Sequence, residues 1–219
     1  MEEIPIEKII RSRRRTIALE VTPAATVIVR APLRTPAEYI EEIIQKKSSW
    51  ILRKMDEIKR RPLSPCHEYA EGEMFLFLGR SYPLHRSITI ERSDRLYVSG
   101  SLMPDIRNQL KHWYREEARK EIRARCMWFS LKTGLVPETI RITDARQRWG
   151  SCTHKGGLNF SWRLIQAPPE IVDYVVVHEL VHLGQPDHSR VFWNKIHSIM
   201  PDYEQRRNWL KEHEWLLKI

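Results

Sequence analysis

Hydrophobic and polar positions change their spacing several times along the first hundred residues. Residues 16–32 carry two β-branched runs around a Pro-Ala-Ala turn, which predicts a hairpin. Apolar positions then recur every three or four residues over 35–61, behind a Thr-Pro start, which predicts one long helix. Short apolar runs between residues 67 and 100 are separated by glycines and charged turns. They predict a small antiparallel sheet.

The second half of the chain is dominated by helical spacing. A long helix is expected from 105 to 132, closed by Gly134. Strands are expected at 139–145 and 158–165, followed by a helix that begins after two prolines and ends at Gly184.

Two shorter helices are then expected, with Ser189 and Asp202 as their caps. The predicted fold class is therefore α+β. The predicted organisation is an N-terminal mixed β/α region over 1–102, β-rich with one long helix, and a second domain over 103–219.

Composition describes an ordinary globular chain. Hydrophobic residues make up 42% and charged residues 30% of the 219 positions. No run approaches the roughly 18 apolar residues of a membrane span, so no membrane partner is expected. The start lacks the apolar core of a signal peptide, and three widely spaced cysteines argue against a disulfide framework. These features predict a cytoplasmic protein.

The net charge of +9 favours anionic partners, with nucleic acid or a nucleotide as candidates through a basic surface. The densest clusters are Arg11 with 13–15, and 59–61. Neither cluster is interleaved with aromatic residues, as a single-strand-binding surface would be. The charge is suggestive on its own and identifies no partner.

The candidate chemistry lies in the HELVH stretch. His178 and His182 are four residues apart, so on a helix both imidazoles project from one face and reach one zinc ion at about 2.0–2.1 Å. Glu179 follows the first histidine, where the carboxylate acts as general base on the water that zinc makes more acidic. The neighbouring residues are almost continuously apolar, and a metal would offset the cost of burying polar groups among them.

A catalytic zinc needs a third protein ligand. Gly184 can end the helix and let the chain present His188, six residues after His182. The competing interpretation places a glutamate from a downstream helix in this position. The candidates for that are Glu204, Glu212 and Glu214.

The wider motif, RQRWGSCTHKGGLNFSWRLIQAPPEIVDYVVVHELVHLGQPDHSRVFW, resembles the YgjP-like metallopeptidase family of predicted metal-dependent hydrolases. It is also similar, more distantly, to SprT-like zincins, whose members act on proteins associated with DNA. The resemblance implies a zincin-like catalytic domain with one zinc ion. It implies His178, His182 and His188 as ligands and Glu179 as the base. It also implies that the strand LNFSWRL lies beside the site and holds an extended substrate by strand addition.

Two residues of this motif are candidates for substrate binding or for stabilising an oxyanion, namely Arg148 and Asn159. The competing role for Arg148 is an exposed charge at the start of a strand or a structural ion pair. Cys152 is expected to be a small buried residue and not a nucleophile.

The leading functional hypothesis is a zinc-dependent hydrolase that cuts peptide bonds in a peptide or protein substrate. One alternative is a metal-dependent nucleoside triphosphate pyrophosphatase. The basic balance fits that substrate, but no Gly-rich phosphate-binding loop is present, and nucleotide chemistry usually uses oxygen-ligated magnesium. A second alternative is a DNA-associated protease that is active only with a partner.

Overall fold

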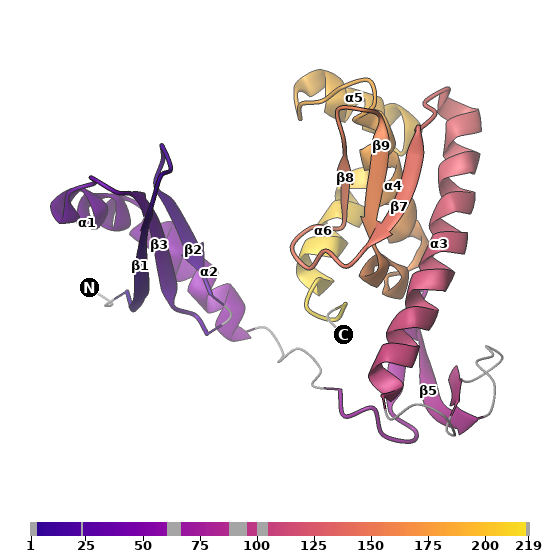
Figure 1. Ribbon diagram of the computed structural model, residues 1–219. Coiled ribbons are helices and arrows are strands. Elements are labelled where there is room, and N and C mark those ends of the chain that lie inside the picture. The colour runs from indigo at the N-terminus through magenta and orange to yellow at the C-terminus, as the bar shows by residue number, and fades with distance from the viewer. Residues whose placement is uncertain (1–3, 23, 61–66, 88–95, 100–104, 218–219) are drawn as a thin grey trace. The chain divides into compact units, whose positions relative to one another are not determined.

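A computed structural model describes residues 4–22, 24–60, 67–87, 96–99 and 105–217. The chain divides into two compact units, Met1–Leu63 and Ser64–Ile219 (Figure 1). Both units combine helices with small sheets, which confirms the predicted α+β class. Among the described residues, none of the helices is long and apolar enough to cross a membrane.

The first unit is a three-stranded sheet with two helices against it. Its elements are β1 (Ile6–Ser12), β2 (Ala18–Val21), β3 (Val27–Pro32), α1 (Ala37–Lys46) and α2 (Ser48–Arg60). The strand order is β1-β3-β2, with β2 antiparallel and β1 parallel to β3. The antiparallel pair confirms the predicted hairpin. Its inward face meets both helices in a small core formed by Ala25, Val27, Val29, Ala31, Ile40, Ile44, Ile51 and Met55.

The prediction of a single helix over 35–61 is wrong in one respect, because the helix is interrupted at Lys47. Two serines follow Lys47, and serine stabilises a helix interior less than the residues around it do. The buried positions of the two helices keep the spacing of one continuous helix across the break. Periodicity alone therefore could not show the interruption.

The second unit begins with short strands and continues with helices around a second sheet. Its strands are β4 (Met74–Phe77), β5 (Arg80–Ser87), β6 (Leu96–Ser99), β7 (Thr139–Thr143), β8 (Gly150–Cys152) and β9 (Gly157–Ser161). Its helices are α3 (Ile106–Thr133), the 3-10 helix η1 (Trp162–Gln166), α4 (Pro169–Val181), α5 (Arg190–Ile199) and α6 (Tyr203–His213). The two sheets have the orders β4-β5-β6 and β7-β9-β8.

The units separate after residue 63, whereas the predicted division falls between residues 102 and 103, outside the described residues. Phe75 and Phe77 of β4 explain the difference. Both are buried in the same core as Trp113 of α3, and the rings of Phe77 and Trp113 lie 5.1 Å apart. Strands β4 and β5 therefore pack with the second unit and not with the first hairpin.

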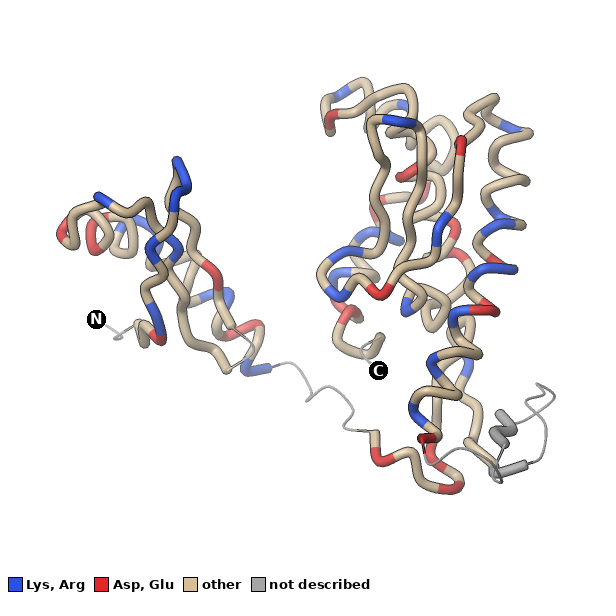
Figure 2. Tube along the Cα trace, in the orientation of Figure 1, with Lys and Arg blue, Asp and Glu red and all other residues tan. Residues whose placement is uncertain are grey.

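Helix α3 confirms the longest predicted helix. The Asp105 carboxylate accepts a hydrogen bond from the Asn108 backbone N–H, and Gly134 ends the helix with a φ of 72°, a conformation that favours glycine. Figure 2 shows Lys and Arg along α3 as well as in the first unit, so the positive charge is spread over both units.

The strand expected at 158–165 ends at Ser161, because the chain turns into η1 at Trp162. The turn is fixed by Asp144, whose carboxylate accepts hydrogen bonds from Trp162 Nε1 at 2.8 Å and Arg163 Nη1 at 2.7 Å. Lys111 Nζ of α3 lies 2.6 Å from the same carboxylate. The Arg163 guanidinium is buried, so this ion-pair network anchors the end of β9 to α3.

Candidate metal centre

Helix α4 carries the HELVH stretch through the core of the second unit. Nine of its thirteen residues are buried, and apolar residues occupy all of its sides, as expected for a helix surrounded by protein. Proline at its start and His182 at its C-cap set its limits. Glu179 is one of the buried residues, with 6% of its surface exposed. The helix therefore holds polar side chains in fixed places among apolar neighbours.

The Nε2 atoms of three imidazoles converge beyond the end of α4. His188 Nε2 lies 3.2 Å from His182 Nε2 and 3.1 Å from His178 Nε2. Two ligand atoms at about 2.0–2.1 Å from a tetrahedral metal are about 3.3 Å apart. Among the described residues, these histidines form the one group of three or more metal-ligating side chains whose ligand atoms lie close enough together to share an ion.

The hydrogen-bonding roles of these rings favour a shared cation. His182 Nδ1 lies 3.0 Å from the Gln185 carbonyl, which can only accept, so Nδ1 carries the proton and Nε2 presents a lone pair. One proton on His188 Nε2 satisfies a single contact, yet two nitrogens face it. A cation bound by all three lone pairs satisfies every contact, and the residues therefore fit a metal ion.

Packing holds the histidine rings where hydrogen bonds do not. Phe192 of α5 is fully buried and its ring lies 4.9, 4.5 and 4.8 Å from the rings of His178, His182 and His188. His178 Nδ1 is buried and has no hydrogen-bond partner among the described residues. Burial lowers the pKa of His178 to about 3, and electrostatic repulsion from the His182 and His188 imidazoles acts in the same direction. His178 is therefore neutral, the state in which its nitrogen binds a metal.

Glu179 lies against the backbone of β8. A Cβ atom added at Gly150 would come within 2.5 Å of Glu179 Cγ and Oε1, so only glycine leaves room for the carboxylate. Burial raises the pKa of Glu179 to about 7, and the positive charge of Arg148 opposes the rise. At neutral pH this carboxyl group can therefore both accept and release a proton.

These groups face a single cavity of about 420 Å³. It lies between α4 on one side and β8 with the following turn on the other. The residues that line it are Gly150, Ser151, Cys152, Thr153, His154, Gly156, His178, Glu179, His182, Leu183, Pro186 and His188. The thiol of Cys152 is half-buried at this cavity, where the sequence predicts a buried residue.

The other predicted site residues lie outside the cavity lining. Arg148 is exposed just before β8 and acts on Glu179 through its charge. Asn159 lies on β9, where its Nδ2 donates to Ser151 Oγ at 3.4 Å. None of the three competing ligand candidates, Glu204, Glu212 and Glu214, belongs to the histidine group.

The strand expected to hold an extended substrate by strand addition, β9, lies in the middle of its sheet. β9 is the central strand of its sheet, paired with β7 on one side and β8 on the other, so it has no free edge. β8 is one of the two edge strands of this sheet, and it lines the cavity. β8 could not be predicted from the sequence, because it has only three residues and begins with glycine.

Three aromatic or basic residues near the histidines were not predicted from the sequence. Phe192 and Trp193 follow His188 by four and five residues, and the Trp193 ring lies 5.7 Å from that of His188. The Arg207 guanidinium of α6 lies 4.6 Å above the Trp193 ring and makes no ion pair with a described carboxylate. Helical spacing after His188 points to Phe192, but no sequence signal connects Arg207 to this site.

A helix that presents HELVH, with a third histidine converging from beyond its end, is the arrangement of a metal-dependent hydrolase. The chain matches the YgjP-like metallopeptidase domain over residues 15–213, and it belongs to that family. No curated protein matches the chain. The crystal structure of the metallopeptidase zymogen of Pyrococcus abyssi abylysin is weakly similar, with a TM-score of 0.32 and 19% identity over 46% of this chain and 92% of that chain.

Proposed function

We propose that this chain is a zinc-dependent peptidase, in which His178, His182 and His188 hold the metal and Glu179 is the general base. The observation that carries the proposal is the convergence of three imidazole Nε2 atoms in a cavity that also contains a buried carboxylate. Three neutral imidazoles suit zinc better than magnesium or calcium, which prefer oxygen ligands. When bound, zinc supplies Lewis-acid chemistry that polarises a carbonyl and makes water more acidic.

Glu179 moves the proton in this proposal. Its carboxylate takes a proton from the attacking water and later gives it to the leaving amine. The raised pKa, about 7, suits both transfers, because a base and its conjugate acid are then both accessible near neutral pH. The absence of a side chain at Gly150 leaves room for the carboxylate in this position.

The free edge of β8 supports an extended peptide as substrate. Trp149 O accepts from Ser161 N, and Gly157 O accepts from Thr153 N, so pairing with β9 uses alternate residues. Gly150 and Cys152 lie between them and turn their backbone groups toward the open edge. A substrate strand paired there would lie along the cavity that contains Glu179.

Nucleoside triphosphate hydrolysis is the second candidate, and Arg207 is the observation that favours it. A guanidinium stacked on Trp193 beside the histidines would attract an anionic group. A peptide carboxylate provides the same charge, so Arg207 also fits the leading proposal. Dependence on DNA or a partner remains a third proposal, motivated by the basic clusters.

The deciding experiment compares the zinc-loaded chain with its Glu179→Gln variant on an unfolded protein and on a panel of nucleoside triphosphates. The amide has the shape of the carboxylate and cannot take a proton, so we expect turnover of the protein to fall by about 10²–10⁴-fold. Zinc content, measured by atomic emission, should not change, because the three histidines are intact.

Glu170→Gln provides the matched control, since Glu170 is an exposed glutamate on the first turn of the same helix. It should retain full turnover. Full turnover by a zinc-loaded Glu179→Gln variant would contradict the proposed base. Phosphate release that depends on Glu179, without proteolysis, would replace the peptidase by the nucleotide hydrolase. Activity that appears only with added DNA would favour the third proposal.

A further inference from the structure

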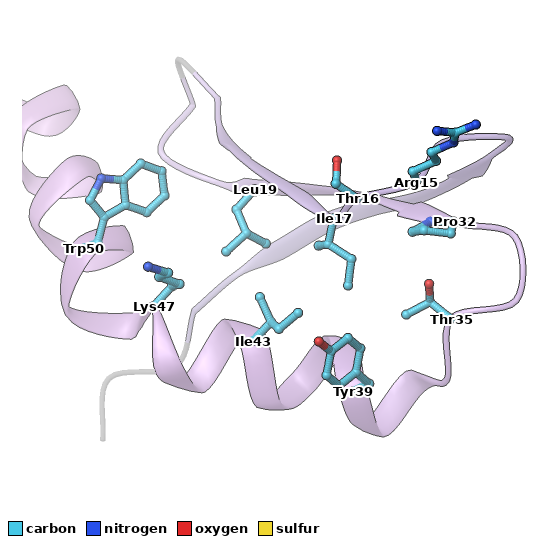
Figure 3. Close-up of a pocket in the computed structure, with 10 residues that line it drawn as sticks. All are labelled: Arg15, Thr16, Ile17, Leu19, Pro32, Thr35, Tyr39, Ile43, Lys47 and Trp50. Atoms are coloured by element: carbon cyan, nitrogen blue, oxygen red, sulfur yellow. The ribbon is translucent and has the colours of Figure 1, made fainter. Parts of the chain in front are cut away.

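The first unit contains a second concave surface, a hollow of about 580 Å³ between the side of β2 and the helices α1 and α2. Figure 3 shows Ile17 and Leu19 on the strand side facing Ile43 and Tyr39 on the helix side. Leu19 is paired with Val29, whose side chain is fully buried in the core of the unit. The hollow is therefore the open end of that core.

The chemistry of the hollow is apolar with a positively charged rim. Tyr39 and Trp50 keep 52% and 40% of their surfaces exposed, which is high for residues of this size. The charged residues in the lining are Arg15 and Lys47, and no carboxylate belongs to it. Neither cation forms an ion pair with a described residue. The hollow thus lacks both an apolar cover and a negative charge.

The backbone of β2 adds hydrogen-bonding capacity beside the hollow. Thr22 N donates to Thr26 O, so pairing with β3 uses Thr22, Glu20 and Ala18 in alternation. Leu19 and Val21 therefore turn their N–H and C=O groups toward the outer edge of the sheet. Within the described part of the chain, no other strand pairs with that edge.

We propose that this hollow binds an extended polypeptide segment as an added strand on β2. Alternate apolar side chains of the segment would cover Ile17, Leu19 and Ile43, and acidic residues at its ends would meet Arg15 and Lys47. The added strand satisfies the edge amides and closes the open end of the core at the same time. For the proposed peptidase, the hollow would be an attachment site for unfolded substrates, distinct from the cavity of the metal centre.

The lining favours a polypeptide over single-stranded nucleic acid. Nucleic acid is held by aromatic rings on which successive bases stack. Here Tyr39 and Trp50 are set apart from each other, and the aliphatic side chains of Leu19 and Ile43 lie between them (Figure 3). Free backbone amides along β2 are complementary to a peptide strand, because only a peptide presents donors and acceptors at the same repeat.

Binding is measured with the full chain carrying Glu179→Gln, without added metal, so that neither cleavage nor the proposed activity affects the result. The probe is a fluorescent peptide with three leucines alternating with threonines, flanked by glutamates at both ends. A second peptide of the same composition has its leucines adjacent, and a fluorescent oligothymidine of similar length tests nucleic acid. Fluorescence anisotropy should show binding of the alternating peptide at least several-fold tighter than of the other two probes.

Charge reversal tests the rim. Arg15→Glu and Lys47→Glu should each weaken binding by roughly three- to tenfold at low salt, since each replaces an attraction by a repulsion between exposed charges. Arg53→Glu is the matched control, an exposed cation of α2 outside the lining, and should leave the affinity unchanged. An equal loss of affinity in all three variants would show that only the net charge of the protein matters, and it would overturn the assigned site.

Methylation of the peptide backbone tests the strand pairing. One probe carries N-methyl groups on the alternate amides that would face β2, and a second carries them on the intervening amides. The probe methylated on the amides that face β2 should lose about tenfold or more in affinity while the other probe retains it, because a methylated amide cannot donate. Equal binding of both sets would overturn the added strand. Binding of oligothymidine alone, or of none of the probes, would overturn the polypeptide as ligand.

Discussion

The metal centre and the hollow of the first unit are both concave, but they treat polar groups in opposite ways. At the metal centre, Glu179 is buried in an apolar helix and the histidine rings surround the fully buried Phe192. In the hollow, apolar side chains form the floor, while the cations Arg15 and Lys47 remain exposed at the rim. The first arrangement fixes a few atoms in place, and the second leaves a surface to be covered.

This difference predicts how each region responds to small changes. Groups held by close packing cannot move without cost, because a protein interior has little free volume. Exposed charges keep their freedom and are screened by salt, so they contribute modestly one at a time. The second unit therefore suits the proposed chemistry, which needs a defined geometry, and the first unit suits the proposed binding of a polypeptide segment.

Among changes that leave the three histidines and Glu179 intact, the largest expected effect comes from one methyl group at the metal centre. Gly150→Ala places a Cβ against Glu179 and forces the carboxylate to move. A displacement of about 1 Å costs on the order of 10²-fold in turnover. Zinc affinity, measured by calorimetry, should change little because the histidines are not touched. Gly184→Ala is the control, since its Cβ would make only an ordinary contact, 3.8 Å from Leu135. Equal turnover in both variants would contradict the close packing proposed for the metal centre.

A smaller effect is expected on stability, from the loss of the Asp144 charge by mutation or at low pH. Burial acts to raise the pKa of Asp144, but hydrogen bonds from Lys111, Arg163 and Trp162 outweigh it and hold the pKa below its usual value. This contribution to stability is present above the unfolded pKa of about 3.9 and is lost as the pH falls toward the lower folded pKa. Asp144→Asn should lower the free energy of unfolding at pH 7 by about 1–2 kcal/mol, allowing for the partial exposure of Asp144.

Urea unfolding at pH 7 and at pH 4 measures this difference, which should shrink at the lower pH. Asp56→Asn gives the comparison within the first unit, because Asp56 and Arg60 form an exposed ion pair with 56% and 79% of their side chains accessible. It should not change the unfolding midpoint. A loss at Asp56 as large as that at Asp144 would contradict the contrast between a carboxylate held by three hydrogen-bond donors and one in a single exposed ion pair.

The smallest effect is expected at Arg148. Its positive charge opposes the burial that raises the pKa of Glu179, so Arg148→Gln should raise that pKa further. The ionised carboxylate is the base, and the acid limb of the pH profile of kcat/KM should therefore shift to higher pH. The maximal rate at high pH should stay the same. A fall in that maximal rate without a shift would instead support the oxyanion role considered for Arg148.

The features that the sequence predicts well are those in which neighbouring residues determine the outcome. The 28-residue helix α3, with Asp105 and Gly134 at its ends, follows from local spacing and capping. His178, His182 and His188 come together because a helix and one turn connect them. The glutamate that follows the first histidine lies in the same cavity for the same reason.

The features that the sequence did not predict depend on contacts between distant residues. Gly150 meets Glu179 across 29 positions of chain, and only the fold shows that a side chain would not fit there. Arg207 reaches Trp193 from another helix. The hollow combines a residue beside the basic cluster, Arg15, with the aromatic residues Tyr39 and Trp50. In sequence these aromatic residues are separated from the cluster, so the pattern of charges alone gave no binding site.

The three histidines lie within eleven consecutive residues, and this short span affects the unfolded chain as well. Closing so short a loop costs little entropy, so the unfolded polypeptide can also bind zinc through the same side chains. A metal stabilises a fold only by the excess of its affinity for the native state over the unfolded state. Zinc should therefore raise the melting temperature by less than its native affinity implies, and the nascent chain can acquire its metal before it has folded.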